Sequence, residues 1–258
     1  MKNQKLAALG LNVLSYEKID STNSELKRLA EQGALEGTLV LAKEQEAGRG
    51  RRGRSWLTPA GSAIAMSLLL RPRIAPEHAS MITLIMGLAA ARAFRQLYQL
   101  EVQIKWPNDV VADGRKICGI LTEMKCEGSQ IDYVVVGVGI NTQVEVFPAE
   151  LEKTAVSLHQ LIGRAPDQEE LIVCCMKEFE RYYEQFLQTQ DLSFLTEEYN
   201  ELLAGRGGRV RVLEPEHEYS GISEGINAAG ELQVRRENGT LESVYAGEVS
   251  VRGIYGYV

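Results

Sequence analysis

Three consecutive strand patterns joined by short turns constrain the fold of this 258-residue chain more than any other feature. They lie at residues 102–106, 116–123 and 133–140, with Asp113-Gly114 and Glu127-Gly128 as turn signals between them. Such connections predict an antiparallel meander, because parallel neighbours need crossovers of about a dozen residues or more. Residues 38–42 and 62–70 add two further strand patterns before the meander.

Helical patterns flank these strands. The first begins near Thr22, which forms a capping-box pattern with Glu25, and it ends at Gly33. Residues 81–100 are apolar on all sides, which is typical of a central buried helix, and residues 168–188 repeat apolar side chains at helical spacing. These elements predict an α+β fold: a mixed, largely antiparallel sheet with packed helices.

The pattern changes after Gly205-Arg206-Gly207-Gly208. Short alternating runs follow, separated by turn signals such as Asn238-Gly239. The runs lie at residues 210–213, 219–222, 232–234, 243–245 and 249–251. We therefore expect a large domain over residues 1–204 and a small all-β barrel over residues 205–258.

Composition excludes several classes of protein. The chain has 28 Lys and Arg against 35 Asp and Glu, a net charge of −7, which disfavours general nucleic-acid binding but leaves room for a local basic site. The four cysteines contain no C-x-x-C pair and the three histidines are scattered, so we expect no disulfide scaffold and no metal cluster held by the protein. Apolar runs fall short of the roughly 20 residues that span a bilayer. The first 14 residues lack a small-residue cleavage site, so we expect a cytoplasmic protein.

The segment Gly48-Arg49-Gly50-Arg51-Arg52-Gly53-Arg54 places four cations in seven positions. Its glycines satisfy the dinucleotide pattern G-x-G-x-x-G, but Pro59 and Gly61 stand where the required helix should run, so that interpretation fails. Three others stay open: a phosphate-binding nucleic-acid segment, a solvated basic turn, and a mobile loop that closes over an anion. We favour the loop, because neighbouring arginines repel one another without an anion and offer forked donors for phosphate or carboxylate.

A second candidate site lies at the end of the strand pattern at residues 102–106. Lys105 stands between Ile104 and Trp106, an apolar setting in which an ammonium group needs an anionic partner. Gly137 and Gly139 interrupt the strand pattern at residues 133–140, which marks places where a ligand or another backbone comes close.

Several motifs together closely resemble the bacterial biotin protein ligase family, in the family's order and from about Ser15 to the C-terminus. They are Ser21-Thr22-Asn23, the segment from Gln45 to Arg54, Lys105-Trp106-Pro107-Asn108-Asp109, Lys116-Ile117-Cys118-Gly119-Ile120-Leu121 and Gly137-Val138-Gly139-Ile140-Asn141. Many members carry a winged helix-turn-helix domain before the first motif, where this chain has only 20 residues. The resemblance therefore implies a ligase without the DNA-binding repressor.

The resemblance also implies roles for individual residues. Lys105 and Arg51 fall on catalytic positions. The positions implied to bind biotin are Ser21, Thr22, Asn23, Gln45, Arg49, Gly50, Arg51, Lys105, Gly137 and Gly139. The positions implied to serve the nucleotide are Arg52, Arg54, Asn108, Lys116 and Asn141.

The reaction implied by the resemblance uses ATP and Mg²⁺ to activate biotin as biotinyl-5′-AMP. A lysine of a biotin carboxyl carrier protein, such as that of acetyl-CoA carboxylase, then receives the biotin. The family often forms homodimers by sheet extension, which the edge strands of a meander would permit. Nucleic acid and membranes are not expected partners.

Two other functions are weighed against this one. A lipoate ligase or octanoyl transferase would share the fold, but the triple-glycine run with a histidine that such relatives carry is missing from this chain. A nucleic-acid module would use the arginine segment alone and leave Lys105 without a purpose. Pyrophosphate exchange that depends on biotin separates these cases.

Overall fold

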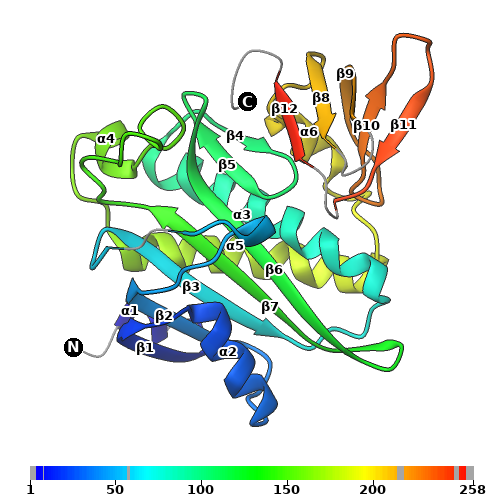
Figure 1. Cartoon of the computed structure of the whole chain (residues 1–258). Helices are drawn as coiled ribbons and strands as arrows, with labels where there is room; N and C mark the ends of the chain where they lie inside the picture. Colours follow the sequence, from blue (N-terminus) through cyan, green and yellow to red (C-terminus); the bar gives the residue numbers. More distant parts are fainter. Residues whose placement is uncertain (1–3, 8, 57–58, 214–217, 247–249, 254–258) are drawn as a thin grey trace.

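The computed structural model describes residues 4–7, 9–56, 59–213, 218–246 and 250–253. Two sheets organise these residues, a large one with helices on both faces and a small one at the C-terminal end of the chain (Figure 1). The α+β class predicted from the sequence is confirmed.

The large sheet has seven strands in the order β1-β2-β3-β7-β6-β5-β4. Their bounds are β1 Asn12–Ile19, β2 Thr38–Gln45, β3 Ala63–Leu70, β4 Val102–Lys105, β5 Asp109–Ala112, β6 Arg115–Glu127 and β7 Gln130–Asn141. Strands β4 to β7 form the predicted antiparallel meander, with β5 as an additional short strand. Strands β1 and β2 are parallel and joined by helix α2, a unit that the sequence analysis did not predict.

Helices cover both faces of this sheet. Helix α2 (Thr22–Glu31) packs on one face, where Leu26 and Ala30 meet the buried Val40, Leu69 and Val135. Helices α3 (Ala79–Tyr98) and α5 (Gln168–Thr189) pack on the other face (Figure 1). Burying a Leu or Ile side chain stabilises the fold by about 1.5–3 kcal/mol, so these layers supply most of its stability. The remaining short helices are α1 (Gln4–Ala7), α4 (Leu158–Ile162) and α6 (Thr196–Leu202), with 3-10 turns at η1 (Arg51–Gly53) and η2 (Pro76–His78).

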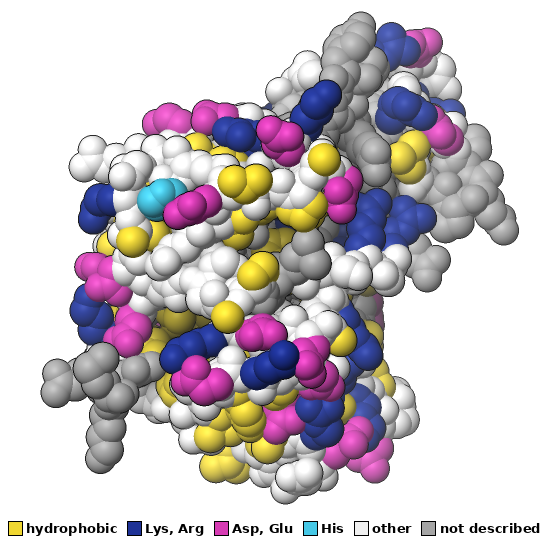
Figure 2. All heavy atoms as spheres, turned by 60° about the vertical axis from the view of Figure 1, so that its left-hand side comes forward, with side chains coloured by type: hydrophobic (Ala, Val, Ile, Leu, Met, Phe, Trp, Pro, Cys, Tyr) yellow, Lys and Arg dark blue, Asp and Glu magenta, His cyan; other side chains and the backbone are white. Residues whose placement is uncertain are grey.

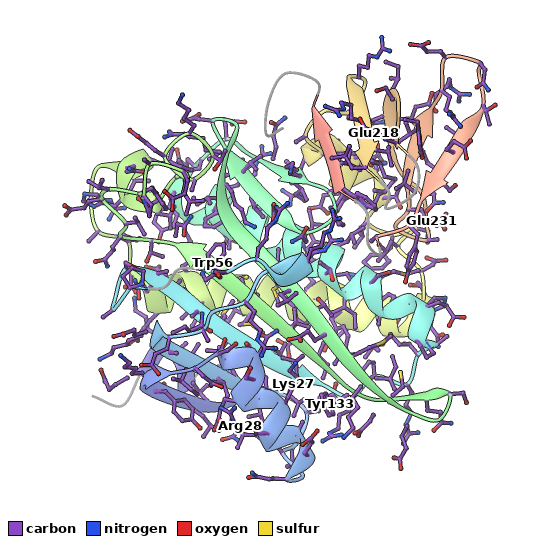
Figure 3. The ribbon with its side chains drawn as sticks, in the orientation of Figure 1. Lys27, Arg28, Trp56, Tyr133, Glu218 and Glu231 are labelled. Atoms are coloured by element: carbon purple, nitrogen blue, oxygen red, sulfur yellow. The ribbon has the colours of Figure 1, made fainter. Side chains whose placement is uncertain are left out.

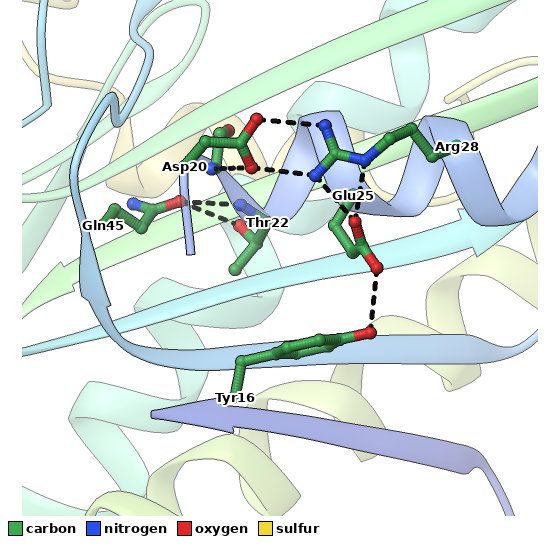
Figure 4. Close-up of polar contacts among 7 residues, drawn as sticks. Tyr16, Asp20, Thr22, Glu25, Arg28 and Gln45 are labelled. Atoms are coloured by element: carbon green, nitrogen blue, oxygen red, sulfur yellow. Dashed lines mark hydrogen bonds and ion pairs between the residues drawn. The ribbon is translucent and has the colours of Figure 1, made fainter. Parts of the chain in front are cut away.

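The N-terminus of α2 differs from the sequence-based expectation. The helix begins at Thr22 and is followed by Gly33 with φ of +87°, as predicted, but the capping box does not form. Ser21 occupies the N-cap position without a side-chain capping bond, and Glu25 pairs with Arg28 and accepts from the Tyr16 hydroxyl (Figure 4). The Thr22 hydroxyl is therefore available for contacts outside the helix.

The small sheet is antiparallel and has five strands in the order β11-β10-β9-β8-β12. Their bounds are β8 Arg209–Leu213, β9 Glu218–Ile226, β10 Leu232–Arg235, β11 Leu241–Val244 and β12 Ser250–Gly253. This confirms the predicted all-β C-terminal unit, while the boundary at residue 204 stays a prediction. The buried Trp106 indole N–H donates to the Gly230 carbonyl at 3.0 Å, and Asn200 bonds the Ile226 backbone in both directions. These bonds attach the small sheet to the large domain next to the Lys105 motif.

All four cysteines are free, as the sequence analysis expected of a chain without a disulfide scaffold. Cys118 and Cys175 are buried in the core, which is the usual place for unreactive thiols. Within the described residues, no helix combines the length and the apolar character that crossing a membrane requires.

Candidate active site

A small cavity of about 40 Å³ lies between the start of α2, the end of β2 and the middle of β6 and β7. Ser21, Thr22 and Asn23, which begin α2, are all buried in its wall. The backbone N–H of Thr22 donates to Gln45 Oε1 at 2.9 Å, and its hydroxyl lies 3.2 Å from the same oxygen (Figure 4). The structure thus brings together the four neutral polar residues that the sequence analysis assigned to one ligand.

A buried chain of hydrogen bonds fixes the direction of the Asn23 carboxamide. Its Nδ2 donates to Glu123 Oε2 at 2.8 Å and to the Leu121 carbonyl at 3.2 Å. Both partners only accept, so the amide nitrogen must face them. The fully buried Ser67 hydroxyl lies 2.6 Å from Asn23 Oδ1 and therefore donates to it. Ser67 Oγ also lies 2.8 Å from the Thr22 hydroxyl, which must then donate to Ser67 in that contact.

The Glu123 carboxylate keeps this arrangement charged at one end. Burial raises its pKa, but hydrogen bonds from Lys27 at 2.6 Å and from Asn23, with the charges of Lys27 and Arg49, lower it by more. The net pKa is below the ordinary value, so Glu123 is an ionised acceptor at neutral pH.

Gly137 and Gly139 on β7 line the small cavity, and the room left by their missing side chains is occupied by this chain itself. A Cβ atom at Gly137 would lie 2.1 Å from Asn23 Oδ1, and one at Gly139 would lie 2.3 Å from Trp56 Cε2. The Trp56 indole, labelled in Figure 3, lies over the two strands where Gly119 and Gly139 pair. Its N–H is buried and has no hydrogen-bond partner within the described part of the chain.

The arginine segment folds back on itself as a short loop. Gly50 N–H donates to the Arg54 carbonyl at 2.7 Å, and Trp56 N–H donates to the Gly48 carbonyl at 2.9 Å. The loop therefore turns back where a dinucleotide fingerprint would continue as a helix, in agreement with the sequence analysis.

The arginines of this loop differ in exposure. Arg51 is half-buried and points inward, whereas Arg49, Arg52 and Arg54 are exposed. Burial lowers the pKa of Arg51, the charge of Asp109 opposes this, and the charges of Arg52 and Arg54 lower the pKa further. An arginine remains protonated in such a setting, so an anion that binds there gains a desolvated cation.

Asn108 holds Arg51 in place. Arg51 Nη1 donates to Asn108 Oδ1 at 2.8 Å, and Asn108 Nδ2 donates to the Ile120 carbonyl at 3.1 Å. Arg51 Nη2 donates to the Ala246 carbonyl of the C-terminal unit at 3.3 Å. The loop, the Lys105 motif and the small sheet therefore meet at one guanidinium.

A larger cavity of about 450 Å³ adjoins the small one, and Gly50, Arg51, Trp56, Asn108 and Lys116 line both. The walls of the larger cavity that lie away from the small one carry Lys105, Arg52 and Arg54. Its far wall is mostly apolar and comes from the loop after β7; the residues there are Val144, Val146, Phe147, Pro148, Leu151, Thr154 and Ala155.

Lys116 and Asn141 support the walls of this larger cavity. Lys116 pairs with the buried Asp109 at 2.6 Å, and its ammonium lies 5.3 Å from the centre of a Trp56 ring. Asn141 Nδ2 donates to the Lys116 and Val156 carbonyls, both at 3.3 Å, and so attaches the loop after β7 to β6. Asp109, the last residue of the motif that begins at Lys105, thus forms an ion pair with Lys116.

Sequence reasoning missed Trp56, Ser67, Glu123 and the apolar loop after β7. The apolar pair Val146 and Phe147 in a polar segment was a usable sequence signal, and the structure leaves Val146 85% exposed. Ser67 stands inside an otherwise apolar strand, and nothing in its sequence neighbourhood indicates contacts with Thr22 and Asn23. Among the described residues, no group of three or more His, Cys, Asp or Glu side chains could hold a metal ion.

Comparisons with known proteins identify the family of this chain. Residues 15–141 match the Biotin/lipoate A/B protein ligase family, and residues 207–252 match the biotin protein ligase C-terminal domain. The chain is 35% identical to the biotin–acetyl-CoA-carboxylase ligase of Paracoccus denitrificans over 229 residues, 84% of this chain and 92% of the relative. It is 32% identical to the bifunctional ligase/repressor BirA of Bacillus subtilis over 251 residues, 96% of this chain and 76% of the relative.

A solved structure shares the fold over almost its whole length. The biotin protein ligase of Aquifex aeolicus in complex with biotin and ATP superposes with a TM-score of 0.82 at 27% identity, covering 94% of this chain and 99% of that one. The matches extend over both sheets and over the motifs that line the two cavities. The chain therefore belongs to the biotin protein ligase family.

Proposed function

We propose that this chain activates biotin with ATP as biotinyl-5′-AMP and transfers the biotin to a lysine of a biotin carboxyl carrier protein. The observation that carries the proposal is the pair of cavities that meet at Arg51, Asn108 and Lys116. The small one presents neutral donors and acceptors, which suit a bicyclic urea. The larger one combines cations with an apolar wall, which suits a triphosphate joined to a purine.

In the first step, the groups bound in the two cavities react with each other where the cavities meet. The biotin carboxylate attacks the α-phosphate of ATP, and the bond to pyrophosphate breaks. Negative charge grows on the oxygens in transfer, and it is stabilised by Arg51 at the junction and by Lys105 in the wall of the larger cavity. Mg²⁺ would enter with the triphosphate and neutralise the departing pyrophosphate.

Biotin binding requires the arginine loop to move. A volume of about 40 Å³ is far below the roughly 300–1,000 Å³ of ordinary ligand sites, and Trp56 occupies the slot over Gly139. When the loop closes again, Trp56 and Arg51 would cover the adenylate and exclude water from the mixed anhydride.

The loop movement has a fluorescence test, because the chain contains two tryptophans. In Trp106→Phe only Trp56 remains, and biotin should change its emission. In Trp56→Phe only the buried Trp106 remains, and biotin should leave its emission unchanged.

The main test is exchange of labelled pyrophosphate into ATP. Exchange should require biotin and Mg²⁺, and lipoate should not replace biotin. Lys105→Ala should lower the rate by about 10²- to 10³-fold, as removal of one donor to a developing charge does elsewhere. Lys125→Ala, which removes a surface lysine paired with Glu31, is the matched control. Exchange driven by lipoate instead of biotin would overturn the proposal.

Three further predictions accompany this function. Binding to DNA is not expected, and on the face shown in Figure 2 acidic and basic side chains alternate instead of forming one basic surface. A homodimer through a sheet edge and a cytoplasmic location also stay predictions. The absence of DNA binding is tested by titration with duplex DNA, the homodimer by sedimentation, and the location by cell fractionation.

A further inference from the structure

A third cavity reaches the same junction from another side. It has a volume of about 260 Å³, and Arg51 and Asn108 line it, as they line the two cavities described above. Its walls come from the start of α3 with Ser80 and Thr83, from the middle of β6, and from Tyr245 and Ala246 of the C-terminal unit. We refer to it as the α3 cleft. The proposed function assigns biotin to the small cavity and ATP to the larger one. The α3 cleft is therefore an additional path to the reacting groups.

The α3 cleft is nearly free of charge. Of the described residues that line it, Arg51 alone carries a charged side chain at neutral pH, and the others are apolar, hydroxylic or amide groups. An ammonium group there would lose hydration, meet Arg51 and find no carboxylate among these described lining residues. A neutral amine loses much less hydration and is not repelled by Arg51, so the cleft favours the deprotonated form of an amine.

The outer part of the cleft carries two large exposed apolar side chains. Met124 of β6 is 47% exposed and Tyr245 of the C-terminal unit is 48% exposed, and both line the cleft. Apolar and hydroxylic walls suit the methylene stem of a lysine, whose amine then lies at the inner end.

We propose that the α3 cleft admits the acceptor lysine of the carrier protein and delivers its neutral amine to the activated carboxyl group beside Arg51 and Asn108. This inference rests on the proposed ligase function. In the step, the lysine nitrogen forms a bond to the biotin carboxyl carbon while the bond from that carbon to the phosphate oxygen breaks. AMP leaves with the electron pair, and one amine proton passes to solvent. The cleft itself supplies the reactive form of the amine, so no basic side chain is needed to generate it.

The first test fills the cleft and measures the two half-reactions separately. Ser80 is half-buried in the first turn of α3, and Ser80→Trp would place an indole in the path of the lysine. Biotin-dependent pyrophosphate exchange should stay within about twofold of the unsubstituted enzyme, as for other surface changes. Transfer of biotin to a carrier domain, and to n-butylamine, should fall by at least about tenfold.

A control variant and two contrary outcomes make this test decisive. Gln96→Trp adds the same indole at an exposed position farther along α3 and should change neither half-reaction. Transfer at the unsubstituted rate in Ser80→Trp would overturn the inference, and so would an equal loss of exchange and transfer. If the unsubstituted enzyme shows no biotin-dependent exchange, the proposed function fails instead.

A second test changes the charge of the α3 cleft at Met124, whose side chain is exposed. Met124→Glu adds a carboxylate to the cleft, which stabilises the ammonium form and raises the pKa of a bound amine. The midpoint of the transfer rate should therefore move to higher pH relative to Met124→Gln, while the exchange profile stays unchanged. Coincident transfer profiles for the two variants would overturn the inference.

Discussion

The two substrate cavities of this protein are built in different ways. The small cavity is bounded mostly by regular elements, namely α2, β2, β6 and β7, with Gly50, Arg51 and Trp56 of the arginine loop on one side, and its polar side chains bond one another. The larger cavity is bounded by the arginine loop, the loop after β7 and the C-terminal unit, and Arg51 joins two of these parts. The small cavity thus discriminates by a preset pattern of donors and acceptors, whereas the larger one depends on parts that come together.

This difference predicts how substitutions act. A change in the small cavity should alter biotin affinity, because it disturbs groups that are already in position. A change at the larger cavity should alter retention of the intermediate, because it weakens closure. Four substitutions, given in order of decreasing expected effect, test whether the two cavities differ in this way.

Gly137→Ala should have the largest effect. The added Cβ would lie 2.1 Å from Asn23 Oδ1, and since a buried hydrogen-bond chain holds that oxygen, relief requires breaking the chain. A cost of about 3 kcal/mol would raise the KM for biotin about 150-fold in pyrophosphate exchange. Gly87→Ala is the control, because its Cβ would meet only ordinary contacts at 3.8 Å. An unchanged KM in Gly137→Ala would show that Asn23 yields freely.

Arg51→Gly should loosen the larger cavity. It removes the bonds to Asn108 and Ala246 together with the cation that faces the adenylate. Losing about 2 kcal/mol of charge-assisted bonding would release biotinyl-5′-AMP about 30-fold faster after a single turnover, measured by rapid quench. Arg73→Gly, at an exposed position outside the three cavities, should retain the intermediate normally. Equal retention in both variants would contradict the proposed closure.

Glu123→Gln should have a smaller effect on the KM for biotin. A glutamine offers both a donor and an acceptor, so of the two groups that face the Asn23 amide nitrogen only the Leu121 carbonyl still fixes the direction of the carboxamide. We expect the KM for biotin to rise about fivefold, equivalent to about 1 kcal/mol, with little change in kcat. Glu31→Gln, which removes a surface partner of Lys125, should change neither constant.

The same variant has a pH signature. Because the folded pKa of Glu123 lies below its ordinary value, its ionised form stabilises the fold above the unfolded carboxyl pKa of about 4.3. That contribution disappears as pH falls through the lower folded value. Urea unfolding should therefore show a smaller loss of stability between pH 7 and acid conditions in Glu123→Gln than in the unsubstituted protein. Parallel pH curves would contradict the assignment.

Trp106→Phe should change stability and leave the small cavity intact. It removes the donor to the Gly230 carbonyl and leaves that carbonyl without its partner, at a cost of about 1 kcal/mol. Thermal unfolding should shift by roughly 2–4 °C, while the KM for biotin stays unchanged. A large rise in that KM would mean that the attachment of the C-terminal unit also sets the small cavity.

Much of the fold was predictable because its elements follow local rules. The meander has short turns and the buried helix α3 is apolar on all sides, so pattern alone indicates them. Strand β1 was missed because its exposed edge carries Glu17 and Lys18, and β5 because four residues are too few for a period to register. The capping box at Thr22 was wrong because Ser21 is the N-cap residue and the Thr22 hydroxyl bonds to Ser67 of a distant strand.

For the site, the sequence specifies which chemical groups are present: neutral polar side chains at Ser21 to Asn23 and Gln45, cations at Arg51, Lys105 and Lys116, and glycines on a buried strand. Only the tertiary structure decided their grouping, since Glu123 lies 100 residues from the amide that it orients and Ala246 lies 195 residues from Arg51. Local propensities depend on neighbours within a few positions. The direction of a buried hydrogen bond depends on whichever donors and acceptors the packing of distant elements brings within reach.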